Sequence, residues 1–167
     1  MADHAAIREL ASRLVAELTA AGKTVATAES CTGGWIAKAI TDIPGSSAVF
    51  AYGIVTYSND AKVSMLGVQT KTIEDHGAVS ELTVKEMVTG AANMSSADIA
   101  MAVSGVAGPD GGTADKPVGT VWFAWAVKGA AATLLETDRQ RFAGDRERVR
   151  ELSVRHAIQG VLERLQI

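Results

Sequence analysis

Hydrophobic positions along the chain recur at two spacings, which predict helices and strands in alternation. In residues 4–21 the apolar positions lie three or four apart, which predicts an amphipathic helix that Gly22 ends. Short continuous apolar runs at 24–28 and 99–103 instead predict buried strands. Such an alternation is typical of α/β proteins.

The other predicted elements extend this order and place a hairpin late in the chain. The remaining predicted helices cover residues 35–41, a short stretch capped by Ser58, residues 70–76, residues 81–94 capped by Ser80, and residues 145–165. The remaining predicted strands cover residues 49–57, 118–127 and 133–137. Early alternation and a late hairpin predict a three-layer α/β/α fold whose mixed β-sheet is covered on both faces. With no repeat and no linker, residues 1–167 are expected to form one domain.

Composition narrows the function classes. Hydrophobic residues make up 47% and charged residues 21% of the 167 residues, which is globular rather than disordered composition. The net charge of −3 argues against a nucleic-acid or anionic-membrane surface. One cysteine excludes an internal disulfide framework, and the three histidines are not at metal-ligand spacing, so we expect no metal. Without a signal peptide or membrane-spanning run, a cytoplasmic protein is expected.

Residues 25–35 predict a strand, a tight turn and the start of a helix. This arrangement places Ser30 on a sharp corner, where a hydroxyl can attack a carbonyl carbon. The N–H groups of Thr32, Gly33 and Gly34 would lie nearby and attract negative charge, such as an oxyanion or a phosphate. Two alternatives stay open: an ordinary turn in which Ser30 or Thr32 caps the helix, and Cys31 as the nucleophile.

Lys62 is the candidate general base for Ser30. A lysine early in a helix opposes the helix dipole, and it can accept a proton only when neutral. Its pKa must then fall from ~10.4 to about 7–8, which predicts that Lys62 is at least half buried. Tyr57, five residues earlier, would orient the amine or relay a proton. The alternatives are a solvated surface lysine and a tyrosine that only packs.

A glycine-rich loop and a cluster of arginines are candidates for anion binding. The loop from Gly105 to Gly112, with Gly108 at its centre, offers backbone N–H groups to a phosphate or carboxamide, but its spacing matches neither a P-loop nor a dinucleotide fingerprint. Arg146 opposes the dipole of the last helix, which a phosphate ligand would relieve, and Arg141 and Arg150 lie close to it in sequence. The alternative is a solvated, salt-bridged arginine.

Several of these stretches together resemble the CinA carboxy-terminal domain family. The motifs occur in the family's order and carry the likeness over about residues 5 to 165. They are AESCTGG at 28–34, GIVTYSNDAK at 53–62, GAVS at 77–80, SGVAGPDGG at 104–112, KPVGT at 116–120 and FAGDR at 142–146. One departure is Ser104, where many relatives have threonine, and it keeps the hydroxyl.

The resemblance implies an activity and a site. Stand-alone members of this family are nicotinamide-nucleotide amidases, which convert nicotinamide mononucleotide and water to nicotinic acid mononucleotide and ammonia without a cofactor. By position, Ser30 would be the nucleophile and Lys62 the general base, and Ser47, Tyr57 or Ser104 would assist the oxyanion donors. The family also suggests a homodimer or higher oligomer. The alternative is a non-catalytic nucleotide-binding module.

Overall fold

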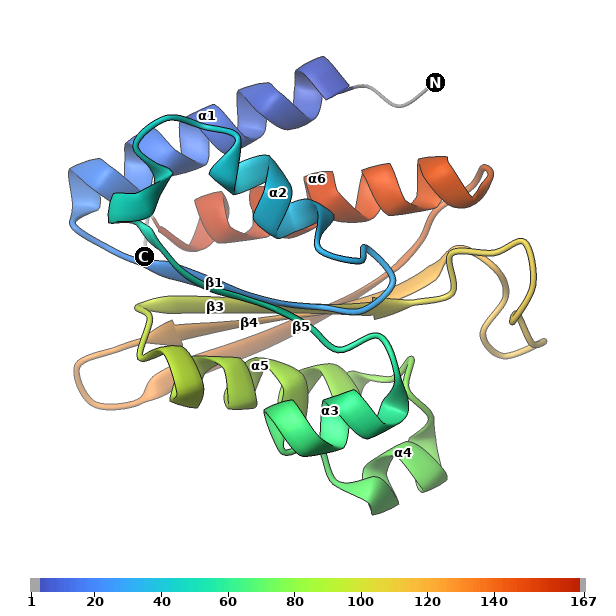
Figure 1. The fold of residues 1–167 in the computed structure, drawn as a ribbon. Helices are drawn as coiled ribbons and strands as arrows, with labels where there is room; N and C mark the ends of the chain where they lie inside the picture. Colours follow the sequence, from blue (N-terminus) through green and yellow to red (C-terminus); the bar gives the residue numbers. More distant parts are fainter. Residues whose placement is uncertain (1–3, 166–167) are drawn as a thin grey trace.

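A five-stranded mixed sheet forms the centre of the molecule in a computed structural model that describes residues 4–165 (Figure 1). The strands are β1 (Val25–Glu29), β2 (Phe50–Val55), β3 (Ile99–Gly105), β4 (Thr120–Lys128) and β5 (Thr133–Arg141). They lie in the order β2-β1-β3-β4-β5. β1 pairs in parallel with both β2 and β3, whereas the pairs β3–β4 and β4–β5 are antiparallel. The carboxyl ends of β1, β2 and β3 therefore meet at one edge of the sheet.

Helices cover both faces of the sheet (Figure 1). One layer holds α1 (His4–Ala21), α2 (Trp35–Thr41) and α6 (Arg146–Arg164). The opposite layer holds α3 (Asn59–Leu66), α4 (Thr70–His76) and α5 (Glu81–Ser95). A short 3-10 helix, η1 (Ser46–Ala48), precedes β2. The three-layer α/β/α fold predicted from the hydrophobic pattern is confirmed.

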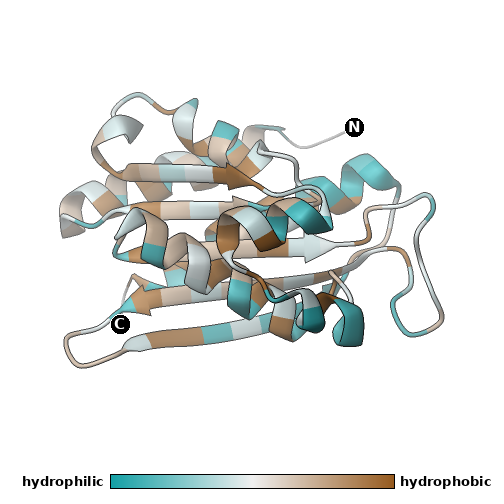
Figure 2. Ribbon diagram, turned by 60° about the horizontal axis from the view of Figure 1, so that its bottom comes forward, coloured by the Kyte–Doolittle hydropathy of each residue, from teal (hydrophilic) through white to brown (hydrophobic). Residues whose placement is uncertain are grey.

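Side-chain alternation along the strands divides the core into two apolar clusters, one on each face. On β3, Met101 and Val103 join the cluster under α1, α2 and α6, whereas Ala100 and Ala102 join the cluster against α5. In Figure 2 the central strands are white to brown, and the most hydrophilic positions lie on helices and loops. Within the described residues 4–165, no helix is long and apolar enough to cross a membrane.

The predicted helix caps Ser58 and Ser80 are confirmed, whereas the strand predicted at 49–57 is longer than the observed β2 and the strand predicted at 133–137 is shorter than the observed β5. Ser58, Ser80 and Asp145 each accept a hydrogen bond from the N–H three residues further on. β5 runs to Arg141 rather than ending at Thr137, because it is an edge strand whose polar second half is still held by backbone pairing to β4. A polar run of this kind carries no hydrophobic periodicity, so its sequence resembles that of a loop.

Candidate active site

Three hydroxyl-bearing residues lie side by side at the carboxyl ends of the parallel strands. Ser30 and Thr56 directly follow β1 and β2, and Ser104 is the second-to-last residue of β3. The main chain aligns them, because Ser30 N–H donates to the carbonyl of Val103 and Thr56 N–H donates to the carbonyl of Glu29. By strand alternation, all three side chains face the α3 and α5 layer.

Lys62 of α3 reaches this row of hydroxyls. Its Nζ lies 2.9 Å from Ser30 Oγ and 2.8 Å from the carbonyl oxygen of Thr56. Lys62 is 1% exposed, and burial lowers its pKa from the ordinary 10.5, an effect that the nearby Cys31 thiol opposes. A neutral amine satisfies both contacts, since it donates to the Thr56 carbonyl and accepts from the Ser30 hydroxyl. The prediction that Lys62 is at least half buried is confirmed.

The local fold explains how a lysine comes to be buried. Ser58 caps α3, and Lys62 and Leu66 are the two buried residues of this helix. They are four residues apart and therefore lie on one face, which packs towards α5 and the sheet. The hydrophobic Leu66 thus anchors the face that carries Lys62 to Ser30.

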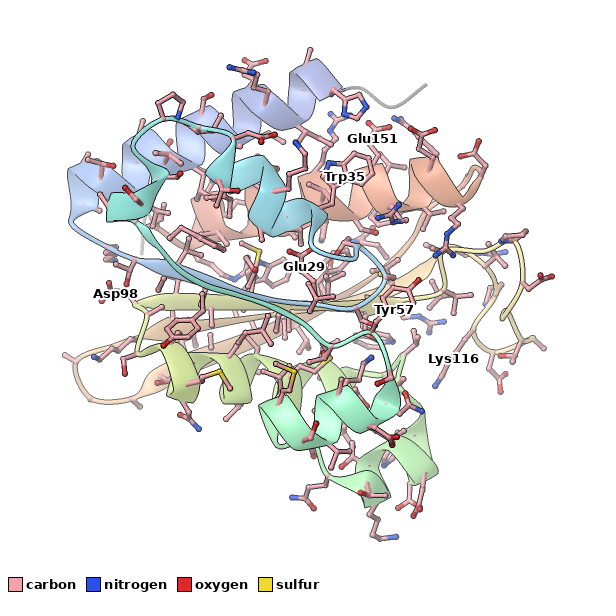
Figure 3. The ribbon with its side chains drawn as sticks, viewed as in Figure 1. Glu29, Trp35, Tyr57, Asp98, Lys116 and Glu151 are labelled. Carbon is pink, nitrogen blue, oxygen red and sulfur yellow. The ribbon has the colours of Figure 1, made fainter. Side chains whose placement is uncertain are left out.

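Glu29, the last residue of β1, closes the start of α2 from below (Figure 3). Its side chain is fully buried and points to the face opposite Ser30, as strand alternation requires. Its carboxylate accepts hydrogen bonds from the Thr32 hydroxyl at 2.7 Å and from the N–H groups of Gly34 at 3.1 Å, Ile36 at 3.0 Å and Ala37 at 2.8 Å. The helix N-terminus that the sequence offered to an oxyanion or phosphate is therefore occupied by the protein's own carboxylate.

This arrangement corrects two of the predicted oxyanion donors. Gly34 N–H binds Glu29, and Gly33 N–H donates to the carbonyl of Ser30 at 2.9 Å. Both glycines are needed for another reason, since their φ angles of +60° and +92° are left-handed values that other residues rarely adopt. Of the three predicted donors, Thr32 alone has an N–H with no acceptor among the described residues.

Replacing Glu29 with alanine is expected to lower the free energy of unfolding by about 3 kcal/mol or more, because three backbone N–H groups at the start of α2 lose a charged acceptor. Glu29→Gln keeps the size and one acceptor oxygen, so a smaller loss of about 1–2 kcal/mol is expected. Urea unfolding measures both. Glu17→Ala, which removes only a surface pair with Arg13, is the control and should change stability by less than about 1 kcal/mol.

Arg150 of α6 binds the same turn from the layer opposite to α3. Its Nε donates to the Cys31 carbonyl at 3.1 Å and its Nη2 donates to the Thr32 carbonyl at 2.9 Å. The guanidinium also lies over the Trp35 ring, 5.5 Å from its centre. The turn that carries Ser30 is thus held by α3 on one side of the sheet and by α6 on the other.

Cys31 is not placed to act as the nucleophile. It is buried, and burial raises the pKa of its thiol to about 12, so the thiolate is scarce at neutral pH. The contacts of the Lys62 amine are made with Ser30 and Thr56 instead.

Tyr57 lies beside the site but does not contact Lys62. It is 59% exposed, and its hydroxyl accepts a hydrogen bond from Arg146 Nη2 at 2.8 Å. Arg146 Nη1 donates to the carbonyl of Gly108 at 2.8 Å. The predicted relay through Tyr57 to the amine is therefore not supported, because the phenol is directed to Arg146. The structure does bring Arg146, Tyr57 and the glycine-rich loop together through these two hydrogen bonds.

Ser104 and Ser47 differ in their relation to the site. Ser104 is 1% exposed, and its hydroxyl donates to the carbonyl of Ala78, which leaves its oxygen free to accept. Ser47 lies in η1, before the amino end of β2, whereas Ser30 follows the carboxyl end of β1. Because the two strands are parallel, the length of the sheet separates Ser47 from Ser30 within one chain, and the predicted assistance from Ser47 is wrong for a single protomer.

A hollow of ≈ 730 Å³ opens beside the turn, on the α2 and α6 side. Basic and aromatic side chains dominate its lining, which comprises His4, Gly33, Gly34, Trp35, Lys38, Arg146, Glu147 and Arg150. Lys and Arg contribute three side chains to this lining against one carboxylate, which favours an anionic ligand. Among residues 4–165, no group of three or more His, Cys, Asp or Glu side chains is arranged to hold a metal ion.

Comparison with known proteins identifies the family of the chain. The CinA C-terminal domain family matches residues 7–165. The chain belongs to this family. It is 52% identical to the nicotinamide-nucleotide amidohydrolase PncC of Escherichia coli strain K12, over 92% of this chain and 91% of that protein. It is 51% identical to the protein of the same name from Pseudomonas putida, over 94% and 96%.

Solved structures of the CinA family share the fold. The structure of the competence/damage inducible protein CihA from Agrobacterium tumefaciens superimposes with a TM-score of 0.91 at 45% identity, covering 97% of this chain and 96% of that one. The expected family membership is therefore confirmed by sequence and by fold.

Sequence reasoning missed two residues that hold the site in this CinA family chain. Glu29 is not among the predicted site residues, although an acidic residue shortly before a helix N-terminus is a typical acceptor for its free N–H groups. Arg150 is predicted only as one of the arginines close to Arg146, although it lies four residues after Arg146 and so on the same face of α6. The position of each residue in its element is evident from the sequence, but the backbone groups that each one binds are not.

Proposed function

We propose that the chain is an amidohydrolase that converts nicotinamide mononucleotide and water to nicotinic acid mononucleotide and ammonia. The names of the curated relatives support this activity. The observation that carries the chemistry is the 2.9 Å contact between the buried Lys62 amine and the Ser30 hydroxyl. In a serine–lysine pair of this kind, the serine hydroxyl is the nucleophile of acyl transfer and the lysine amine is its general base.

In the first half of the proposed reaction, Ser30 is acylated. Lys62 accepts the Ser30 proton while Ser30 Oγ attacks the carboxamide carbon, and the carbonyl electrons form an oxyanion. Thr32 N–H is the proposed main donor to that oxyanion, and removal of one such donor typically costs about 10²–10³ in rate. When the intermediate collapses, the C–N bond breaks and the Lys62 ammonium protonates the leaving nitrogen, which departs as ammonia.

In the second half, water releases the product. Lys62, neutral again, accepts a proton from a water molecule that attacks the ester carbon. The oxyanion forms at the same place, the bond to Ser30 Oγ breaks, and Lys62 returns the proton to Ser30. The net reaction consumes one water and yields the carboxylate and ammonia.

We place the phosphate of the substrate at Arg146. Its guanidinium joins Tyr57 to the Gly108 carbonyl, and it borders the basic hollow beside the nucleophile turn. With the N–H groups at the start of α2 bound to Glu29, the phosphate is left to side-chain donors, and Arg146 is one of the cationic side chains that line this hollow. A bidentate arginine suits a phosphate.

The expected result for the purified chain is ammonia release from nicotinamide mononucleotide, with little or none from nicotinamide or glutamine, which lack the ribose phosphate. A coupled glutamate dehydrogenase assay measures the ammonia, and mass spectrometry identifies nicotinic acid mononucleotide. Binding of the nucleotide without turnover would overturn the proposed activity and support a non-catalytic nucleotide-binding module.

We also propose that the protein forms a homodimer or a higher homo-oligomer. We expect it to be cytoplasmic and not to bind nucleic acid. The edge strand β2 supports assembly, since the run from Phe50 to Tyr57 carries no charge and exposes Tyr52 and Val55 by 47% and 42%. Exposed uncharged edge strands favour pairing with another chain.

A further inference from the structure

We propose that Arg150 is a positioning residue that fixes the peptide between Cys31 and Thr32 so that the Thr32 N–H is directed at the reacting oxygen. This inference rests on the proposed amidohydrolase activity and adds a residue to it. Arg150 would not touch the substrate's reacting atoms; it would act through the backbone of the nucleophile turn.

Most backbone N–H groups of the nucleophile turn already donate to an acceptor within the protein. Ser30 N–H binds the Val103 carbonyl, Gly33 N–H binds the Ser30 carbonyl, and Trp35 N–H binds the Thr32 carbonyl. The N–H groups of Gly34, Ile36 and Ala37 at the start of α2 all bind the carboxylate of Glu29.

Two N–H groups of the turn then remain, those of Cys31 and Thr32. Neither donates to an acceptor among residues 4–165, and the Thr32 N–H belongs to the peptide whose carbonyl Arg150 binds. Thr32 N–H has no acceptor among residues 4–165, although Thr32 is fully buried. A buried N–H without a partner is costly, and in a site for acyl transfer it is a donor held ready for the oxyanion.

The Arg150 contact also fixes the direction in which the Thr32 N–H points. A trans peptide is planar, so its N–H points opposite to its C=O. The carbonyl of Cys31 belongs to the same peptide as the Thr32 N–H, and Arg150 Nε binds it at 3.1 Å from α6. The Thr32 N–H must therefore point away from α6, towards the side of the sheet where Lys62 meets Ser30.

The guanidinium of Arg150 is itself fixed in place by several contacts. Its two donating nitrogens bind two successive carbonyls of the turn, and its plane lies over the Trp35 ring. A planar fork of this kind fixes two acceptors at once, which a single ammonium group does not do. The nucleophile turn is thus fastened at its carbonyls by Arg150 and at the following N–H groups by Glu29.

The experiment compares Arg150→Met and Arg150→Lys with the unchanged protein. For Arg150→Met we expect kcat for nicotinamide mononucleotide to fall about 10–10²-fold with KM changed less than about threefold, because misdirecting one oxyanion donor acts on the transition state. Arg150→Lys should recover part of the loss, since an amine reaches one carbonyl of the two. Arg155→Met is the matched control, an arginine of the same helix paired with Glu151, and should leave kcat unchanged.

A second readout separates this inference from the substrate assignment and from phosphate binding. A fluorophosphonate phosphorylates an activated serine: Ser30 Oγ bonds to phosphorus, fluoride leaves, and Lys62 takes the proton. Its phosphoryl oxygen uses the oxyanion donor but it carries no nucleotide, so Arg150→Met should label about 10-fold or more slowly by mass spectrometry.

The outcomes are distinct. If the unchanged protein is labelled at Ser30 but does not hydrolyse nicotinamide mononucleotide, the proposed function fails and the labelling rates still test Arg150. If Arg150→Met labels at the normal rate and only raises KM, Arg150 binds the phosphate and the inference is overturned. An unchanged protein that resists the reagent would overturn it as well, and circular dichroism spectra of all variants confirm folding.

Discussion

Ser30→Ala is expected to lower kcat for nicotinamide mononucleotide by at least about 10³-fold, because the attacking oxygen is removed while the fold is kept. Ser30 is small and 8% exposed, and its hydroxyl contacts Lys62 without carrying a core packing role. The variant should therefore unfold at nearly the same temperature as the unchanged protein. Ammonia release under saturating substrate is the measurement.

The neighbouring cysteine provides the matched control for this result. Cys31→Ala removes the other nucleophilic side chain of the turn, and activity should stay within about fivefold of normal, since a buried thiol with a pKa of about 12 does not supply the attacking group. The reverse pattern, with activity retained in Ser30→Ala and lost in Cys31→Ala, would assign the chemistry to the thiol.

Lys62→Met is expected to remove activity to a similar extent, about 10³-fold or more, and at the same time to raise the melting temperature. The loss follows because no other base contacts Ser30 Oγ among the described residues. The gain in stability follows because methionine fills the same buried space without the cost of an amine that is 1% exposed. Kinetics and a thermal melt on one preparation test both halves.

The sign of the pH dependence follows from the lowered pKa of Lys62. Below its folded pKa, both the folded and the unfolded protein carry the proton, and burial of the charge lowers stability fully. Between the folded pKa and the ordinary 10.5, the unfolded state binds more protons, so stability rises with pH. The stabilisation by Lys62→Met should accordingly be larger at low pH and shrink towards pH 10.5. Activity of the unchanged protein should rise with pH until the amine is neutral.

Lys71→Met is the control for both measurements, because Lys71 is an exposed lysine of α4 paired with Asp75. Its removal should change neither the rate nor the pH dependence of stability measurably. A Lys62→Met variant that kept its activity, or that was less stable than the unchanged protein at low pH, would contradict the neutral buried base.

Much of this fold was predictable from local sequence rules. Ser58 and Ser80 are capping residues whose effect extends over one helical turn, and the apolar runs of β1 and β3 mark strands buried on both faces. Ser30 and Lys62 were identifiable as candidates, because a hydroxyl at a strand corner and a lysine early in a helix are features of single elements, and the family resemblance assigned them as a pair. Their meeting depends on topology, which the alternation of strands and helices implied.

The parts that were not predictable depend on what a backbone group contacts across the molecule. The sequence shows that Gly33 and Gly34 follow a strand, but not that their N–H groups are already bound to Ser30 and Glu29. Likewise, Tyr57 is close to Lys62 in sequence, yet its hydroxyl meets Arg146 from the far end of the chain. Hydrogen-bond partners over such separations are set by tertiary packing, which residue spacing does not encode.

The nucleophile turn draws its supports from both layers of the molecule, with Lys62 arriving from α3 and Arg150 from α6. Hydrolysis of the nucleotide therefore depends on both helix layers. Displacement of α3 would remove the base from Ser30, and displacement of α6 would release the carbonyl of Cys31. Removing α6 would take away Arg146 and Arg150 together with the buried apolar residues that cover one face of the sheet, so the serine–lysine pair cannot be separated from this helix.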